Sequence, residues 1–530
     1  MPNFCRIKFG SGFRLDSNSI FEDKLDHNLV LEEGIVNSGV IEGKAINNTV
    51  NGKNINSGNG INISSELKEG EVSNIKIAVS DNAVGIENSG FILGELSGKD
   101  KTTSEYSGNG IAMTFKGAEG NIEIGNIENT GVIKAIHNAS VTELNSTNSN
   151  NGIIISDSSS GTLTLGKIEN NGLVNIERNI SPTNTKENGS SHIAQESYNG
   201  IVIENKNLNS NLTFETIENN GSILVSGKSS VDVQDEFSLN GIYVGTTGAI
   251  NGTIKNDGKV ASGWGSSDAN SKNYGNGILI YSTEQNEGST TNLENTGLIV
   301  GKENAIAISQ NSNIEFNYNN YGVIAGKNLV SASGYNDDKS ISFGLGIKLD
   351  KNGNIASVLS SKDSKEKHAL NIFKGDENSQ YSIINTEIKG KDAYNEYNED
   401  TNLSNVIING AGDTSGTVTI ADEKEFVLNN GVVNAYKTAI TIGDNSTFTG
   451  TNVIINGGGL IGSGNETDVI KGNKDVKLNL AGEIYINGSI DLDSNGERND
   501  KDILTFGNGE IRTEAGIFDT IKGADTKYRK

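Results

Sequence analysis

Residues 127–133 read I-E-N-T-G-V-I, and the same pattern returns along most of this chain. Written as apolar-x-Asn-x-Gly-x-apolar, it recurs with its glycine at Gly39, Gly90, Gly131, Gly172, Gly221, Gly258, Gly297, Gly322 and Gly431. The spacing drifts around a period of about 40 residues, which is typical of stacked repeats and not of a compact domain.

The heptad predicts its own local structure. In an extended strand alternate side chains share a face, so the two isoleucines, the asparagine and the glycine point to one side. We expect the isoleucines to lie in a core and each asparagine to bond to the asparagine of the next repeat through its amide. Glycine permits a bend or a positive φ angle that other residues resist. The heptad therefore predicts a strand, a corner and a second strand.

A second signature, Asn-Gly followed by apolar residues, alternates with the first. Its asparagines are Asn59, Asn109, Asn151, Asn199, Asn240 and Asn276. Asn-Gly between alternating hydrophobic residues usually indicates a hairpin, but the regular alternation favours a corner that enters a strand. Two signatures per cycle predict one coil per about 20 residues, as in a parallel β-helix. At that length the chain would make roughly 22–26 coils and a rod on the order of 110 Å long.

The composition agrees with a thin core. Apolar residues make up 34% of the 530 residues, and only 2 prolines occur. Because a proline inside a coil would remove a ladder hydrogen bond, their scarcity favours continuous stacking over disorder. The net charge of −24 excludes a basic nucleic-acid-binding surface and would keep a long rod soluble.

Targeting signals are missing from this sequence. A single cysteine, Cys5, excludes an internal disulfide framework, and no run of 18 apolar residues predicts a transmembrane helix. The first residues lack the apolar segment of a signal peptide, and the last lack the amphipathic strands of an outer-membrane barrel. We therefore expect a fragment or a truncated gene product.

The repeats divide the chain into four parts. We predict an irregular first coil at 1–34, β-helix repeats at 35–330, weakened repeats with exposed loops at 331–402, and further β-helix rungs at 403–530. Polar inserts interrupt the repeats at 181–199, 262–276, around 142–150 and around 283–291. Inserts in a solenoid usually form loops on one face, where recognition takes place.

From residue 35 onwards the chain resembles a known family. The I-x-N-x-G-x-I rungs, the N-G-I corners and the late stretches GSGNETDVI (462–470) and INGSIDLDSNGERNDKDILTF (486–506) are similar to the passenger region of large type V autotransporter adhesins. Members of that family begin with a signal peptide and end in a translocating β-barrel, and this sequence contains neither.

The resemblance implies a single elongated right-handed parallel β-helix with polar loop inserts, displayed on the surface of a Gram-negative bacterium in association with its outer membrane. It implies a secreted virulence factor in cell adhesion, a stalk and binding surface for glycans or proteins of host or bacterial cells. A separate outer-membrane β-barrel translocator is an implied partner. The alternatives are a carbohydrate-cleaving β-helix enzyme, in which carboxylates of successive coils converge, and a purely structural spacer.

One segment has the spacing of a calcium loop. The candidate oxygen ligands are Asp491, Asp493, Asn495 and Asp502, although an aspartate replaces the usual final glutamate. No helical pattern flanks the segment, so the alternative is a set of polar turn residues. Calcium is the one cofactor that the sequence suggests.

Exposed aromatic residues are the other candidates for binding. Trp264, the one tryptophan, and Tyr274 fall in the polar insert at 262–276, where rings can stack on sugars or anchor a protein contact. The alternative is a tryptophan folded back over the coil as a cap. The four histidines are far apart in the sequence, and Ser191-His192 lacks a nucleophile-elbow context, so we predict no catalytic residue.

Overall fold

The computed structural model describes residues 13–16, 26–32, 34–47, 52–66, 72–79, 84–116, 121–159, 161–182, 192–207, 211–229, 232–264, 270–282, 290–310, 315–332, 343–360, 382–460, 467–492, 503–513 and 521–522. Every regular element in these ranges is a β-strand, and almost all pairs are parallel. No helix of the described residues is long and apolar enough to cross a membrane. The predicted all-β, parallel architecture is therefore confirmed.

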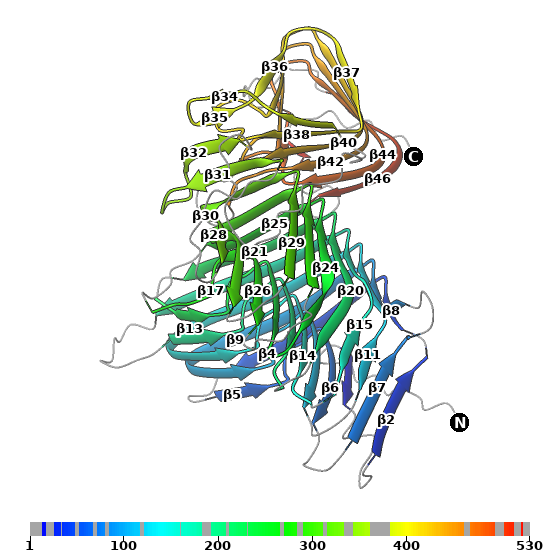
Figure 1. The fold of residues 1–530 in the computed structure, drawn as a ribbon, viewed down its shortest axis with the longest axis vertical. Coiled ribbons are helices and arrows are strands. Elements are labelled where there is room, and N and C mark those ends of the chain that lie inside the picture. Colours follow the sequence, from blue (N-terminus) through cyan, green and yellow to red (C-terminus); the bar gives the residue numbers. More distant parts are fainter. Residues whose placement is uncertain are drawn as a thin grey trace.

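The described residues between 13 and 332 form a stack of coils, here called the N-terminal stack (Figure 1). In each coil the chain passes through an asparagine row, turns at the corner glycine into a long row, and turns at the Asn-Gly corner into a return row. A fourth row then leads to the asparagine row of the next coil. Parallel pairing between equivalent strands joins the coils.

The asparagine row contains β3 (Ile35–Asn37), β8 (Val84–Asn88), β12 (Asn126–Asn129), β16 (Ile168–Asn170), β20 (Leu212–Asn219), β24 (Ile250–Asn256), β27 (Thr290–Asn295) and β29 (Glu315–Asn320). The fourth row contains β2 (Asp26–Leu31), β7 (Val72–Ile77), β11 (Ile122–Ile124) and β15 (Leu163–Leu165) and merges with the asparagine row from β20 onwards.

The long row contains β4 (Val40–Asn47), β9 (Phe91–Glu105), β13 (Val132–Thr147), β17 (Leu173–Pro182), β21 (Ser222–Ser229), β25 (Lys259–Trp264), β28 (Leu298–Gln310) and β30 (Val323–Ala332), with β5 (Gly52–Ile55), β18 (His192–Gln195) and β22 (Gln234–Glu236) as separate distal segments. The return row contains β1 (Phe13–Asp16), β6 (Ile61–Glu66), β10 (Ile111–Lys116), β14 (Ile153–Asp157), β19 (Ile201–Asn205), β23 (Ile242–Thr246) and β26 (Asn276–Ser282).

Coils of this stack are about twice as long as the sequence suggested. Successive asparagines of the heptad lie 51, 41, 41, 49, 37, 39 and 25 residues apart and are bonded directly to one another. The two signatures thus mark two corners of one coil, so the prediction of one coil per about 20 residues is wrong for all but the last coil of this stack, and with it the total of roughly 22–26 coils. The insert expected around 142–150 is instead the end of β13 and the corner after it.

The asparagine ladder predicted from the heptad is confirmed. Nδ2 of each asparagine donates to Oδ1 of the next over 2.7–2.8 Å, from Asn37 through to Asn320. The Asn-Gly asparagines form a second ladder with the opposite polarity, since Asn109 Nδ2 donates back to Asn59 Oδ1 and Asn276 Nδ2 to Asn240 Oδ1. The asparagines of both ladders are buried, so each side-chain amide must find its hydrogen-bond partners within the protein.

The corner glycine has a different role from the one expected. Gly131 does not have a positive φ angle. A β-carbon at this position would instead lie 2.1 Å from the carbonyl oxygen of Gly90 in the coil before. Close approach of consecutive coils therefore selects glycine here. Positive φ angles occur instead at the Asn-Gly corner, as at Asn148 (φ 49°) and Asn150 (φ 56°).

A hairpin and a second stack follow. The strand β31 (Leu345–Leu349) extends the long row and pairs antiparallel with β32 (Ile355–Ser360). The C-terminal stack contains β33 (Ser382–Asn385), β37 (Thr401–Ser404), β38 (Val406–Gly410), β40 (Glu425–Ala435), β42 (Thr447–Asn456), β44 (Lys477–Asn487) and β46 (Ile503–Thr513) in one sheet. Its second sheet contains β36 (Asn395–Tyr397), β39 (Val418–Ile420), β41 (Ile440–Ile442), β43 (Ile470–Gly472), β45 (Ile490–Asp491) and β47 (Ile521–Lys522), and β34 (Ile388–Lys389) and β35 (Asp392–Ala393) form a small hairpin.

The C-terminal stack has its own asparagine ladder. Asn385, Asn409, Asn434, Asn456 and Asn487 bond in sequence, 24, 25, 22 and 31 residues apart. These coils are shorter than most of those in the N-terminal stack. The signal in the sequence is an apolar pair followed by Asn, as in I-I-N-G at 407–410 and 454–457, which differs from the heptad.

The two stacks lie side by side, and their coils run in opposite directions. Asn409 Nδ2 donates to the main-chain oxygen of Tyr321, whereas Asn456, further along the chain, donates to that of Asp257. A separate apolar cluster fills the contact, with Leu298 and Val323 from one stack and Tyr436 from the other. Figure 1 shows the yellow-to-red stack against the green part of the other. A single elongated helix is therefore not confirmed, and the handedness stays a prediction.

Replacing Asn170 by alanine should destabilise the N-terminal stack. Asn170 accepts from Asn129 and donates to Asn219, so the change removes the donor of the buried Asn219 Oδ1 and leaves Asn129 Nδ2 only its longer bond to the Leu173 main-chain oxygen. We expect the free energy of unfolding to fall by about 2 kcal/mol or more in urea denaturation. Asn138→Ala, which removes an exposed amide pair with Asn179, should cost less than about 0.5 kcal/mol. Equal effects of the two changes would contradict the role of the ladder.

Candidate binding face

The predicted calcium loop falls mostly outside the described residues. Asp491 ends β45, while Asp493, Asn495 and Asp502 are not described. Among the residues that the structure describes, no group of three or more His, Cys, Asp or Glu side chains could hold a metal ion. The calcium site therefore stays a prediction.

The two aromatic candidates lie around one corner. Trp264 ends β25, and its side chain is not among those described. Tyr274 stands in the corner where most coils have a serine, and its hydroxyl lies 3.4 Å from Glu303 Oε1. Burial and the Glu303 carboxylate raise the pKa of Tyr274 to about 12. Its ring is half-buried, and a role in binding stays a prediction.

A different set of residues forms a chemically richer surface on the outer side of the return row. We call it the acid–aromatic face and define it by Tyr106, Glu196, Glu204, Lys206, Phe237, Tyr243 and Tyr281. Strands of this row are buried on both sides, as in β14 and β19, where every residue is buried. The outer side is covered because corner residues fold back over it.

The corner geometry explains this cover. The residue before the corner serine has a positive φ angle in successive coils, for example at Tyr106 (φ 48°), Glu196 (φ 50°) and Phe237 (φ 50°). Tyr106 packs in one apolar cluster with Ala112 and other outward residues of the return row. The unusual backbone thus places a variable side chain of each coil on the same face.

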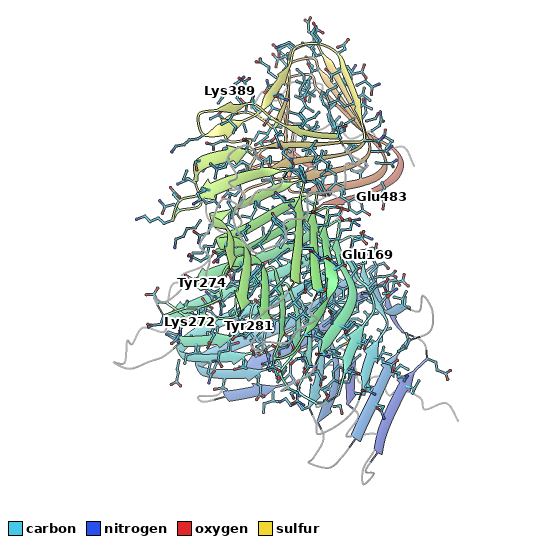
Figure 2. All side chains as sticks on the ribbon, viewed as in Figure 1. Glu169, Lys272, Tyr274, Tyr281, Lys389 and Glu483 are labelled. Carbon is cyan, nitrogen blue, oxygen red and sulfur yellow. The ribbon has the colours of Figure 1, made fainter. Side chains whose placement is uncertain are left out.

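Aromatic rings form one part of the face. The rings of Phe237 and Tyr243 are stacked with centroids 5.7 Å apart, and Tyr281 meets Phe237 edge-on at 4.6 Å. Lys116 Nζ lies 4.6 Å from the centre of the Tyr106 ring and 3.0 Å from Glu105 Oε1. Figure 2 shows Tyr281 on the side of the N-terminal stack that also carries Lys272.

Carboxylates form the other part. Lys206 Nζ is bonded to Glu196 and lies 3.3 Å from Glu204 Oε1. The Ser156 hydroxyl donates to Glu204 Oε1 over 2.6 Å, and Gln195 bonds to Glu236 of the next coil. Carboxylates from neighbouring coils therefore converge here, which the sequence did not predict.

These groups perturb each other's protonation. Burial and the nearby Glu204 carboxylate raise the pKa of Glu196 to about 7. Burial alone would lower the pKa of Lys206, but Glu204 and Glu196 together raise it. Burial, followed by Glu196 and Glu204, raises the pKa of Tyr243. Perturbed groups of this kind cluster at functional sites more often than elsewhere.

The face remains accessible at its polar groups. The side chains of Lys206 and Glu196 are 34% and 17% exposed, and the rings of Phe237 and Tyr281 are partly exposed. Tyr106, Tyr243 and Glu204 are buried beneath them. Rings beside hydrogen-bond acceptors are suited to a ligand with an apolar face and hydroxyl groups at its edge. The sequence pattern that marks this face is the residue before Ser-x-Asn-Gly, and the Asn-Gly signature by itself predicts only a corner. The pattern occurs as Y-S-G-N-G (106–110), E-S-Y-N-G (196–200) and F-S-L-N-G (237–241).

A separate cleft of about 510 Å³ lies on the sheet formed by the fourth and asparagine rows. Gly125 and Gly166 line it together with polar side chains such as Asn121, Thr164 and Glu215. The cleft offers hydroxyl, amide and carboxylate groups, whereas the acid–aromatic face combines packed aromatic rings with carboxylates of neighbouring coils. We therefore favour the acid–aromatic face as the functional site.

The interior of the stack also contains a polar network. Arg178 Nη1 donates to Asp235 Oδ1 over 2.6 Å, and His137 Nδ1 bonds to the Tyr198 hydroxyl over 2.7 Å. All four side chains are fully buried. Burial and the nearby Arg178 charge lower the pKa of His137 to about 3, so it is neutral at physiological pH. The network joins coils from within and offers no surface to a ligand.

No known protein family, no curated protein and no solved structure matches this chain. The choice of function therefore depends on the geometry of the described residues.

Glu196 should make stability depend on pH. Its pKa is about 7 in the folded protein and 4.5 as a free side chain, so the folded state binds more protons between these values. Stability contributed by Glu196 should therefore fall as the pH rises from about 4.5 to about 7. In urea titrations the wild type should lose stability relative to Glu196→Gln across this window. The control Glu87→Gln removes an exposed carboxylate, and a pH-independent difference for Glu196→Gln would contradict the assignment.

Proposed function

We propose that this protein is the passenger region of an autotransporter-type adhesin, displayed outside the cell in association with the outer membrane, and that it binds glycans of host or bacterial surfaces. The observation that carries the proposal is the acid–aromatic face, where the partly exposed rings of Phe237 and Tyr281 pack on each other and on buried Tyr243, which lies close to the carboxylates of Glu196 and Glu204. The stacked coils then serve as the rigid support of this face.

The chemistry of the face favours sugars. Aromatic rings pack against the C–H face of a pyranose, and carboxylates accept hydrogen bonds from its hydroxyl groups. In the acid–aromatic face two glutamates, Glu196 and Glu204, surround one lysine, Lys206, and the whole chain has a net charge of −24. This negative charge disfavours the binding of uronic acids and sulfated polymers. The ligand class is therefore a neutral or amine-bearing glycan.

Truncation of the rings should weaken binding. We expect Phe237→Ala and Tyr281→Ala each to reduce affinity for a neutral glycan hit by about 5-fold or more, because a ring contact contributes about 1 kcal/mol. The measurement is a glycan array followed by calorimetry with the strongest ligand. Tyr394→Ala, which removes a ring from the C-terminal stack beside Lys389, is the matched control and should leave affinity unchanged.

Two outcomes would contradict the proposal. One is the absence of saturable binding to neutral and amine-bearing glycans and to epithelial or bacterial cells, which would favour a structural spacer. The other is an equal loss of affinity in Tyr394→Ala, because that ring lies outside the acid–aromatic face.

A carbohydrate-cleaving enzyme is the second candidate, favoured by one observation. Glu196 and Glu204 share Lys206, and a pKa of about 7 suits Glu196 to donate a proton to a glycosidic oxygen. In that case the protein should release reducing ends from a bound glycan, and Glu196→Gln should abolish release while binding persists. A bound glycan that stays intact over long incubation would exclude this candidate.

A further inference from the structure

Two carboxylates of the acid–aromatic face share one ammonium group. Lys206 Nζ is bonded to Glu196 and lies 3.3 Å from Glu204 Oε1. One positive charge therefore faces two negative ones. Burial, followed by the charge of Glu204, raises the pKa of Glu196 to about 7, which shows that Lys206 does not fully compensate the pair.

One oxygen of this pair lacks a hydrogen bond. Glu204 is almost fully buried, and its Oε1 accepts a hydrogen bond from the Ser156 hydroxyl. Its Oε2 is enclosed and has no hydrogen-bond partner among the residues that the structure describes. A buried carboxylate oxygen in this situation is costly, and a second cation compensates it best.

Aromatic rings complete the surroundings of the carboxylates. Gly245 pairs in register with Glu204, and a β-carbon on Gly245 would clash with the Tyr243 hydroxyl, so this hydroxyl lies beside the Glu204 position. Tyr281 follows Gly245 in the same column, and Phe237 packs on both tyrosine rings. Because the faces of aromatic rings attract cations, rings beside carboxylates are suited to organic ammonium groups.

The lysine that joins the carboxylates is their most accessible partner. The side chain of Lys206 is 34% exposed, whereas Glu196 is 17% exposed and Glu204 is almost fully buried. A lysine side chain is flexible and keeps its charged end in water where it can. Lys206 Nζ can therefore turn outward when another ammonium group takes its place.

We propose that the acid–aromatic face selects glycans with free amino groups over neutral and N-acetylated ones, and that the sugar ammonium replaces Lys206 Nζ between Glu196 and Glu204. The sugar ring then packs against Phe237 and Tyr281. This inference rests on the proposed glycan binding and narrows its ligand class.

Two oligosaccharides of equal length test the selection. A chitosan tetramer carries an amino group on every sugar, and a chitin tetramer carries an acetamido group in its place. We expect the chitosan tetramer to bind at least about 10-fold more tightly, because only its ammonium groups pair with the carboxylates. Isothermal titration calorimetry measures both affinities.

A pair of lysine substitutions gives the test its sign. Lys206→Met should raise the affinity for the chitosan tetramer by about 3-fold or more, because it removes the competing ammonium group. Lys255→Met is the matched control, since Lys255 is 36% exposed and lies between Glu218 and Asp257 on the asparagine row. This control changes the net charge equally and should leave the affinity unchanged. Circular dichroism should show both variants folded.

Carboxylate variants test the same contact without Lys206→Met. Glu196→Gln should weaken binding of the chitosan tetramer at least about 10-fold and leave the chitin tetramer unaffected. Glu218→Gln is the control, because Glu218 has the same 17% exposure and also pairs with a lysine. It should leave both affinities unchanged.

The outcomes separate this inference from the proposed function. Equal or tighter binding of the chitin tetramer would overturn the selection for amino groups and leave glycan binding intact. A loss of affinity in Lys206→Met would also overturn it, because Lys206 would then contact the ligand itself. Equal effects in Lys206→Met and Lys255→Met would overturn it as well, since they indicate a general attraction to an acidic protein. Absence of binding to every glycan would overturn both.

Discussion

The structure depends on one constraint, the need of a buried asparagine amide for partners on both sides. Asn129 in the asparagine row has no access to water, so its Nδ2 and Oδ1 must meet groups of the coils above and below. The neighbour that fits without distortion is another asparagine at the same height. This requirement fixes the parallel register of the coils and brings the corner glycines so close that no side chain fits between them.

The same group also joins the two stacks. In the N-terminal stack the second amide hydrogen is used locally, as where Asn170 donates to the main-chain oxygen of Ser222 in the next coil. In the C-terminal stack it crosses to the neighbour, as from Asn434 to the Thr296 oxygen over 2.7 Å. The two stacks are antiparallel to each other. The asparagines of successive C-terminal coils therefore bond to N-terminal coils in reverse order along the sequence.

The hydrogen-bonded ladders inside the coils hold the fold, so the residues on the outer surface can differ from coil to coil. The corner before Ser-x-Asn-Gly holds its backbone through serine and asparagine contacts, so the residue at its start can be Asn, Tyr, Glu or Phe without loss of the fold. That freedom gathers Tyr106, Glu196 and Phe237 on one face, where burial raises the pKa of Tyr106 and of Glu196.

The sequence by itself determined the stacked parallel strands, the ladder of asparagines and the Asn-Gly corners, because each depends on residues a few positions apart that repeat with the coil. It did not determine the length of a coil, since two corner signatures per cycle fit either one wide coil or two narrow ones. Only the tertiary structure decided that, through the pairing of Asn129 with Asn170 and not with an asparagine half as far away. The fold-back of the second stack, and the meeting of Glu196 with residues of other coils, were likewise decided in space, because contacts between distant segments leave no local pattern in the chain.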